Sequence, residues 1–491
     1  MKRKQPLQFA VTATAAAALC IAAFFQEANA VPSFARKYRT SCQTCHVVYP
    51  QLNAFGRAFR NNGYRMPGDD QDYVKDEPTP LGAPAWKKVF PNAVWPADIP
   101  GGSVASFIVE SNYTINNSEA VSNEFDGIDE IGLIFGGTAG ESFSYFGDVD
   151  LFEEGGPGGI GRLFFQYNHP TGLFNFRAGQ IEPRAVSFSN HRRLIRISNY
   201  LVDVFPTLPA QNFFGFSPNQ RGIEVYGSKE GPGHQGGITW AFGLVNGEYG
   251  GAAEALGESG AVGELIAELE ELKEEAGGEF DPNSRKDYYA SVEYKIGGMG
   301  VLGGGSSDTL TESNNWVDNS VTLGAYYYNG TAPAIMEAGA AEEADMLSRG
   351  ESPRHLLPAA GGATEESVYM PNGNHFFRAG IKADAFFHNL NIFGVLQLND
   401  DDWQFGDRRE FRSTLGMVEA HYVVYPWLIP AYRFENVNPT FGASFQRHSF
   451  NTSFLVRANA KLLIEFVKSQ GDAPNLAPFD DRFRVGFNIA F

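Results

Sequence analysis

The chain ends with Arg482-Phe483-Arg484-Val485-Gly486-Phe487-Asn488-Ile489-Ala490-Phe491, and this stretch is the clearest indication of the fold. Every odd-numbered residue in it is apolar, and every even-numbered residue is polar or small. Because successive side chains of a β-strand point to opposite faces, this strand has one apolar and one polar face. An alternating strand that ends on an aromatic residue is typical of a barrel that meets lipid outside and water inside.

The same alternation recurs through most of the chain. In one example Tyr288, Val292 and Ile296 alternate with polar residues such as Glu293 and Lys295. The chain is also rich in glycine (55 residues) and in aromatic residues (14%). A soluble β-sandwich would show a similar alternation, but charged residues on the second face favour a water-filled lumen. We therefore predict an all-β fold, a transmembrane antiparallel β-barrel.

Turn residues between the alternating segments predict about 16 strands. Three connections, residues 181–218, 247–286 and 330–373, are long and are expected outside the cell, while the glycine-rich piece 297–317 is expected in the periplasm. The predicted strands lie near residues 104–114, 129–137, 143–152, 161–168, 173–180, 219–228, 236–246, 287–296, 318–329, 374–387, 389–398, 410–424, 428–437, 446–456, 460–470 and 482–491.

The first 30 residues read as a secretory signal peptide. Lys2, Arg3 and Lys4 precede an apolar stretch, and Ala28-Asn29-Ala30 offers a cleavage site before Val31. Cys20 lies inside the apolar stretch and is expected to be removed with it. The predicted organisation is a signal peptide at 1–30, a haem segment at 31–100 and a barrel at 101–491.

The haem assignment rests on Cys42-Gln43-Thr44-Cys45-His46, the attachment motif of a c-type haem. Cys42 and Cys45 are the only cysteines outside the predicted leader, so no disulfide or zinc framework competes for them. We predict one covalently bound haem c, with thioether bonds to both cysteines and His46 as the proximal axial ligand of the iron. The alternative is a redox-active CxxC pair followed by a chance histidine.

The second axial ligand is open to three interpretations. Met66, followed by Pro67, could supply a thioether to the haem iron. A histidine of the barrel is the rival, and His191 is the strongest of these because its long connection could fold into the lumen. An iron with an open position is the third.

The segment 31–100 is short for a domain that buries a haem by itself. Its apolar residues include Leu52, Phe55 and Phe59 at helical spacing, which predicts a helix from about Pro50 to Asn61 that stops at Gly63. We expect this short α-helical cytochrome segment to plug the barrel lumen, where the inner wall gives the haem drier surroundings.

A basic cluster in the 181–218 connection contrasts with the net charge of −19. Arg192 and Arg193, with Arg184 and Arg196 nearby, are candidate partners of the haem propionates, since guanidinium groups pair well with carboxylates. A basic constriction of a pore, or a site for anionic lipopolysaccharide, is the alternative that we favour for them. The overall acidity makes nucleic acid an improbable partner. Acidic loop residues could attract Fe(II), or could serve solubility alone.

The N-terminal segment resembles a known family. The residues Pro32-Ser33-Phe34-Ala35-Arg36, the Cys42 to His46 motif, Pro50-Gln51-Leu52-Asn53-Ala54-Phe55-Gly56-Arg57 and Asn62-Gly63-Tyr64 are similar to the haem segment of outer-membrane monohaem cytochrome-porins. That family includes the iron-oxidising cytochrome-porins of chemolithotrophic bacteria.

The resemblance implies an electron-transfer protein of the bacterial outer membrane. It would take electrons from extracellular Fe(II) and pass them to a periplasmic c-type cytochrome. Another donor, outward electron flow, and a solute-conducting porin with a structural or sensory haem remain as alternatives. Outer-membrane lipid and a homotrimer are further expected partners.

Overall fold

The computed structural model describes the barrel wall, part of the N-terminal segment and several connections. The described residues are 33–68, 70, 88–89, 105–116, 123–125, 127–139, 142–153, 156–189, 191–194, 199–205, 207, 212–216, 220–247, 283, 285–304, 315–338, 356–358, 366–402, 411–440, 444–471 and 481–490. The predicted signal peptide, Arg196, and the acidic residues near 264–275 lie outside them.

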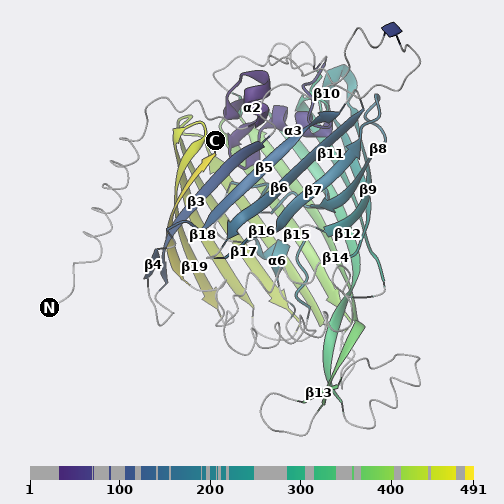
Figure 1. Ribbon diagram of the computed structural model, residues 1–491. Helices are drawn as coiled ribbons and strands as arrows, with labels where there is room; N and C mark the ends of the chain where they lie inside the picture. The colour runs from purple at the N-terminus through teal and green to yellow at the C-terminus, as the bar shows by residue number, and fades with distance from the viewer. Residues whose placement is uncertain are drawn as a thin grey trace, which may run out of the picture.

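Within these ranges, sixteen long antiparallel strands close into a barrel (Figure 1). Two three-residue strands, β4 (Asn123–Phe125) and β13 (Leu356–Pro358), pair beside the long ones. The long strands are β3 (Ala105–Asn116), β5 (Glu130–Ala139), β6 (Phe143–Glu153), β7 (Ile160–Tyr167), β8 (Asn175–Ile181), β9 (Gln220–Glu230), β10 (Gln235–Val245), β11 (Asp287–Met299), β12 (Ser320–Ala338), β14 (Glu366–Phe387), β15 (Leu390–Asp401), β16 (Phe411–Tyr422), β17 (Leu428–Pro439), β18 (Phe445–Arg457), β19 (Ala460–Gly471) and β20 (Arg482–Ala490).

The final strand closes the barrel. β20 pairs with β19 on one side and with β3 on the other, in a register that places Phe487 opposite Ser111 and Val485 opposite Tyr113. Closure leaves no unpaired sheet edge, which a strand inside a membrane cannot tolerate. The predicted barrel is confirmed, and fourteen of the predicted strands agree with the observed ones to within a few residues.

Apolar side chains form the outer surface of the wall. On β11, Tyr294 and Ile296 are 53% and 54% exposed, whereas Tyr289, on the inner face, is fully buried. The predicted direction of the alternation is therefore confirmed. A band of exposed large apolar residues of this kind would be costly in water and is stable in lipid. Among the described helices, none has the length and apolar character to cross a bilayer.

A charge in the middle of this outer band should destabilise the barrel. Ile381 on β14 is 60% exposed and lies opposite Leu396 of β15, midway along the wall. We expect Ile381→Arg to lower the free energy of unfolding in lipid vesicles by about 2–4 kcal/mol, because an arginine near the bilayer midplane is poorly solvated. Denaturant titration of the refolded protein measures this change.

The matched control for that change is Lys468→Ala. Lys468 pairs with Asp481 at 2.8 Å, and both side chains are about half exposed. Such a surface ion pair contributes roughly 0–1 kcal/mol. Equal effects of the two substitutions would contradict a lipid-facing position for Ile381.

The third long connection differs from its prediction. Residues 330–373 were expected to form an external loop, but β12 runs on to Ala338 and β14 begins at Glu366. The two strands stay paired beyond the end of the barrel, with Ala338 opposite Glu366 (Figure 1). Backbone hydrogen bonds between two strands do not require one apolar and one polar face. The pairing can therefore continue beyond the membrane, where side chains no longer alternate between apolar and polar.

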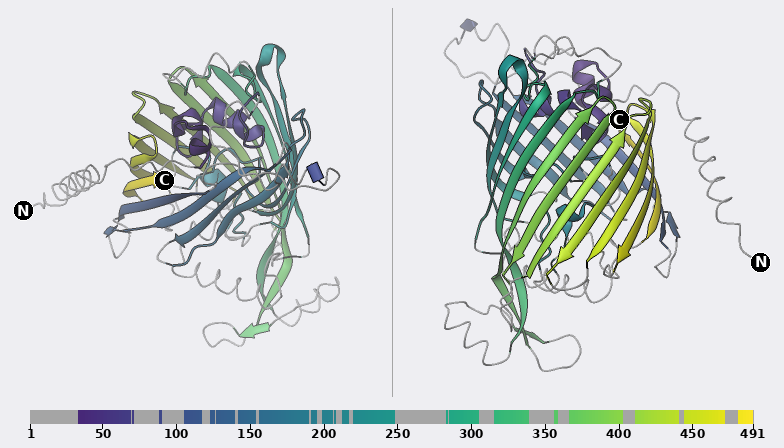
Figure 2. Two further views of the ribbon diagram at one scale, coloured as in Figure 1. Left: turned by 45° about the horizontal axis from the view of Figure 1, so that its top comes forward. Right: turned by 180° about the vertical axis from the view of Figure 1, so that it is seen from behind.

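The two ends of the barrel differ. The end that we call the short-turn mouth carries brief connections such as 388–389 and 458–459, and the chain terminus after β20 lies there (Figures 1 and 2). The other end carries the protruding β12–β14 hairpin. Short connections are periplasmic in bacterial outer-membrane barrels, so the short-turn mouth faces the periplasm.

The connection after β8 leaves the wall at the end opposite the short-turn mouth, as the strand count predicted, and then folds into the lumen. We call residues 182–219 the inner loop. Its described part includes helix α6 (Leu201–Val204), and its apolar side chains Val186, Phe188, Leu194 and Phe214 are at most 2% exposed. The loop folds inward because its many large apolar side chains are stabilised by leaving water.

The inner loop crosses to the far side of the ring. Tyr200 donates a hydrogen bond to Glu419 of β16 at 2.7 Å, and the backbone N–H of Leu201 donates to Glu435 of β17 at 2.7 Å. Arg193 also donates to Glu419, at 2.9 Å. These strands lie opposite β8, where the loop begins. The loop therefore spans the lumen.

Aromatic residues fill the space between loop and wall. The Phe214 ring lies 4.5 Å from that of Tyr328 and 4.9 Å from that of Phe376, and Phe188 and Phe216 are 5.6 Å apart. The charged residues on the inner face of the strands were expected to line a water-filled lumen. Here much of that face lies beneath packed protein, because the inner loop covers it.

Candidate functional site

The N-terminal segment lies inside the short-turn mouth (Figures 1 and 2). Asn61 and Asn62 donate hydrogen bonds to the carbonyl oxygens of Val301 and Leu302, at 2.9 and 2.7 Å, in the glycine-rich connection. Arg57 pairs with Asp384 of β14 at 2.9 Å. Its elements are α2 (Ser33–Tyr38), the 3₁₀ turn η1 (Cys42–Thr44), β1 (His46–Val48), β2 (Gln51–Leu52) and α3 (Ala54–Asn61).

Helix α3 positions the CxxCH motif. It begins at Ala54 rather than near Pro50, because Gln51 and Leu52 pair with β1 and the Asn53 side chain caps the helix by accepting from the Gly56 N–H at 2.9 Å. A Cβ on Gly56 would collide with the Cys45 carbonyl. Glycine at this position therefore lets the helix pack directly on the motif.

A cavity of about 350 Å³ opens between the N-terminal segment, the inner loop and the wall. Its volume falls in the range of small-molecule and cofactor sites. Cys42, Cys45, His46, Met66 and His191 all line it. The structure thus brings together the predicted thioether positions, the predicted proximal ligand and two of the candidate distal ligands.

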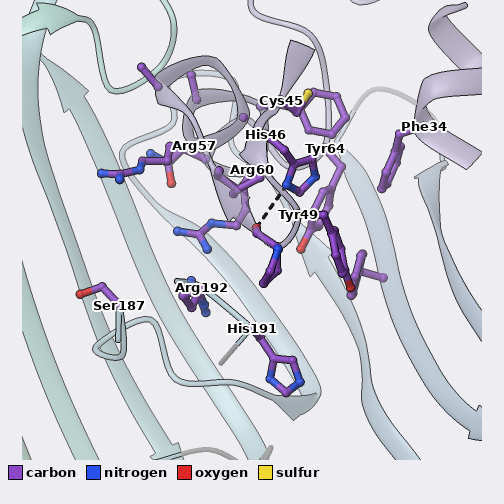
Figure 3. A pocket seen from close by; sticks show the side chains of 18 of the residues that line it. Phe34, Cys45, His46, Tyr49, Arg57, Arg60, Tyr64, Ser187, His191 and Arg192 are labelled. Atoms are coloured by element: carbon purple, nitrogen blue, oxygen red, sulfur yellow. Dashed lines mark hydrogen bonds between the residues drawn. The ribbon is translucent and has the colours of Figure 1, made fainter. Parts of the chain in front are cut away.

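His46 is oriented as an iron ligand would be. Its Nδ1 lies 3.2 Å from the Pro50 carbonyl oxygen and donates to it, which leaves the Nε2 lone pair for a metal (Figure 3). Burial, partly opposed by backbone contacts, lowers the pKa of His46 to about 4. The imidazole is therefore neutral at physiological pH, the form that binds metals.

The two cysteines are free thiols. Burial raises the pKa of Cys42 to about 11, and burial together with Cys42 raises the pKa of Cys45 to about 12. Catalytic redox cysteines have lowered pKa values that supply thiolate near neutral pH. The surroundings of these thiols therefore do not favour the redox-active CxxC alternative. No cluster of three or more histidine, cysteine or acidic side chains in the described ranges could hold a metal ion.

Met66 and His191 occupy different walls of the cavity. Met66 is 6% exposed and packs with Tyr38, Phe55 and Phe59. His191 is on the inner loop, and its buried Nδ1 has no hydrogen-bond partner. His46 and His191 are the histidines that line the cavity in the described part of the chain.

The arginines predicted to bind propionates already have carboxylate partners. Arg192 pairs with Glu182 at 2.6 Å, and Arg193 pairs with Glu419 at 2.9 Å. Both line the cavity, as does Arg184, which pairs with Glu224 at 3.3 Å. Sequence reasoning missed Arg60, which reaches the same cavity from α3 (Figure 3). Its position three residues after Arg57 on the predicted helix is the signal that could have indicated it.

The fold and the lipid-facing band define the class of this protein. A closed antiparallel barrel with an apolar outer surface is the architecture of proteins of the bacterial outer membrane, and we place the chain there.

Comparison with known proteins finds barrels of this class. No protein-family model and no curated protein matches the chain. Among solved structures, an anion-selective porin from Comamonas acidovorans has 13% identity and a TM-score of 0.46, over 79% of this chain and 98% of that chain. A loop L8 deletion mutant of OmpT, an outer membrane protein of Vibrio cholerae, has 10% identity and a TM-score of 0.45, over 79% and 98%. Salmonella typhi OmpF, in complex with daunomycin, has 9% identity and a TM-score of 0.46, over 79% and 97%.

Proposed function

We propose that this protein is a c-type cytochrome fused to a porin-like barrel, and that it transfers electrons across the outer membrane. One observation carries the proposal: Cys42, Cys45 and a neutral His46 with Nε2 available line a single cavity inside a membrane barrel. The haem would be held by thioether bonds at both cysteines and by His46. It would supply a one-electron Fe(III)/Fe(II) couple.

The packed lumen favours transfer of electrons over passage of solutes. The inner loop joins opposite sides of the ring, and its aromatic residues pack against Tyr326, Tyr328 and Phe376. A solute must displace these side chains, whereas electron transfer needs no open channel. The alternative of a solute-conducting porin is therefore the weaker one.

The position of the cavity suggests which side each partner approaches. Ser41, next to Cys42, is exposed at the short-turn mouth, so a periplasmic c-type cytochrome could approach the haem closely. The donor that we favour, extracellular Fe(II), would give its electron at the other end, across the inner loop. Another electron donor, or electron transfer in the outward direction, would use the same route across the inner loop. Assembly as a homotrimer, surrounded by outer-membrane lipid, belongs to this proposal.

Stopped-flow absorbance tests the donor. The oxidised, haem-loaded protein in detergent is mixed with Fe(II), and the haem bands are followed. We expect rapid reduction that is lost in His46→Ala, because the imidazole sets the ligand field and potential of the iron. If dithionite reduces the haem but Fe(II) does not, iron oxidation is rejected. Another donor, or electron transfer in the outward direction, is then favoured.

A further inference from the structure

Arg60 has no counter-ion in the described structure. Its Nε is buried without a hydrogen-bond partner, and none of the described carboxylates forms an ion pair with it. Figure 3 shows its guanidinium group in the cavity, between His46 and Arg192. An unpaired guanidinium that faces an interior cavity is costly, so Arg60 marks a site suited to an anion.

The neighbours of Arg60 carry excess positive charge. Arg60 shares the cavity lining with four arginines that form ion pairs with three carboxylates, so within the described structure these five arginines exceed those carboxylates by two. The ion pairs of the group are Arg162–Asp148 at 2.6 Å, Arg162–Glu182 at 3.8 Å, Arg192–Glu182 at 2.6 Å, Arg177–Glu224 at 2.8 Å and Arg184–Glu224 at 3.3 Å.

Electrostatics sets the cost of this arrangement. Burial, and after it the charges of Arg192 and Arg184, lowers the pKa of Arg60 well below its ordinary value. Arginine hardly ever loses its proton in proteins, so an incoming anion relieves the repulsion more readily than deprotonation does. Ser187 adds a buried hydroxyl without a hydrogen-bond partner to the same cavity lining.

We propose that Arg60, flanked by Arg184 and Arg192, binds a pair of carboxylates, and that these are the two propionates of the haem. This inference rests on the proposed function. Two carboxylates match the two excess charges, and the guanidinium fork suits bidentate binding. Arg193 is not needed for this role, because it already contacts Glu419 at 2.9 Å and Asp384 at 3.6 Å.

The test is the reduction potential of the haem in Arg60→Gln. Loss of a positive charge near the haem favours Fe(III). At a fixed potential the ratio of reduced to oxidised haem should therefore fall about tenfold, a shift of ~59 mV for one electron. A propionate without its arginine also takes up a proton more readily. The potential of Arg60→Gln should then decrease with rising pH across the weakly acidic range, where that of the parent protein is flat.

Two variants separate charge from structure. Arg60→Lys keeps the charge and should restore most of the potential. Arg57→Gln removes an arginine from the same helix that already pairs with Asp384 at 2.9 Å, and should cause a smaller shift with no new pH dependence. An unchanged potential and a flat pH profile in Arg60→Gln, at normal haem content, would overturn the inference.

Covalent haem content, measured first by the pyridine haemochrome spectrum, tests the proposed function separately. If the protein carries no haem, inorganic phosphate becomes the probe of the same arginines. Stabilisation of the parent protein by phosphate that is lost in Arg60→Gln would support an anion site for a free ligand and reject the propionates. No stabilisation would reject the site as a whole.

Discussion

Excision of residues 186–216, with a short glycine-serine linker in their place, is expected to raise the ion conductance of the barrel at least tenfold. The intact inner loop is anchored to Glu419 and Glu435 on the opposite wall and packs against Phe376. A barrel of sixteen strands is wide enough for an aqueous channel once such a filling is removed. Single-channel recording in planar bilayers measures the change.

Two controls accompany this measurement. The parent protein should pass little current, and Lys468→Ala, at an exposed surface ion pair, should leave that current unchanged. Excision of residues 33–68 as well should raise the conductance further, because that segment occupies the short-turn mouth. If the parent protein already conducts like an open porin, the lumen is not closed in the membrane and the solute-conducting alternative is favoured.

Replacement of both Cys42 and Cys45 by serine is expected to abolish covalent haem completely. The two thiols are free, line one cavity with His46, and are the only cysteines outside the predicted leader. No other side chain can therefore form the thioether bonds. The measurement is haem staining of the protein after denaturing electrophoresis, with the parent protein alongside.

The barrel should survive this change. The wall strands pair with one another independently of the motif, so the double variant should keep the altered gel mobility of a folded barrel before heating. Matched substitution of Ser41 and Thr44, which flank the cysteines, should leave haem attachment intact. Staining that persists in the double cysteine variant would refute attachment of the haem at Cys42 and Cys45.

The wall could be predicted closely because its rule is local. Each strand needs only an apolar and a polar face in alternation, as in Arg482 to Phe491, and lipid on one side selects the direction. The alternation predicts less where the chain leaves the boundary between lipid and water. The β12–β14 hairpin extends beyond the barrel, and the apolar inner loop turns inward, because hydrogen bonding and burial there follow other constraints.

The candidate site also has features that local sequence predicts and features that depend on the tertiary structure. The CxxCH motif, the alternation of the strands and the end of helix α3 at Asn61 could be predicted from sequence, since each depends on neighbouring residues. The tertiary structure was needed to show that His191 shares a cavity with His46, that Arg193 turns to Glu419, and that Arg60 is left without a carboxylate. The physical reason is that the partner of a charge depends on which distant segments share a cavity, and no local pattern of residues encodes that choice.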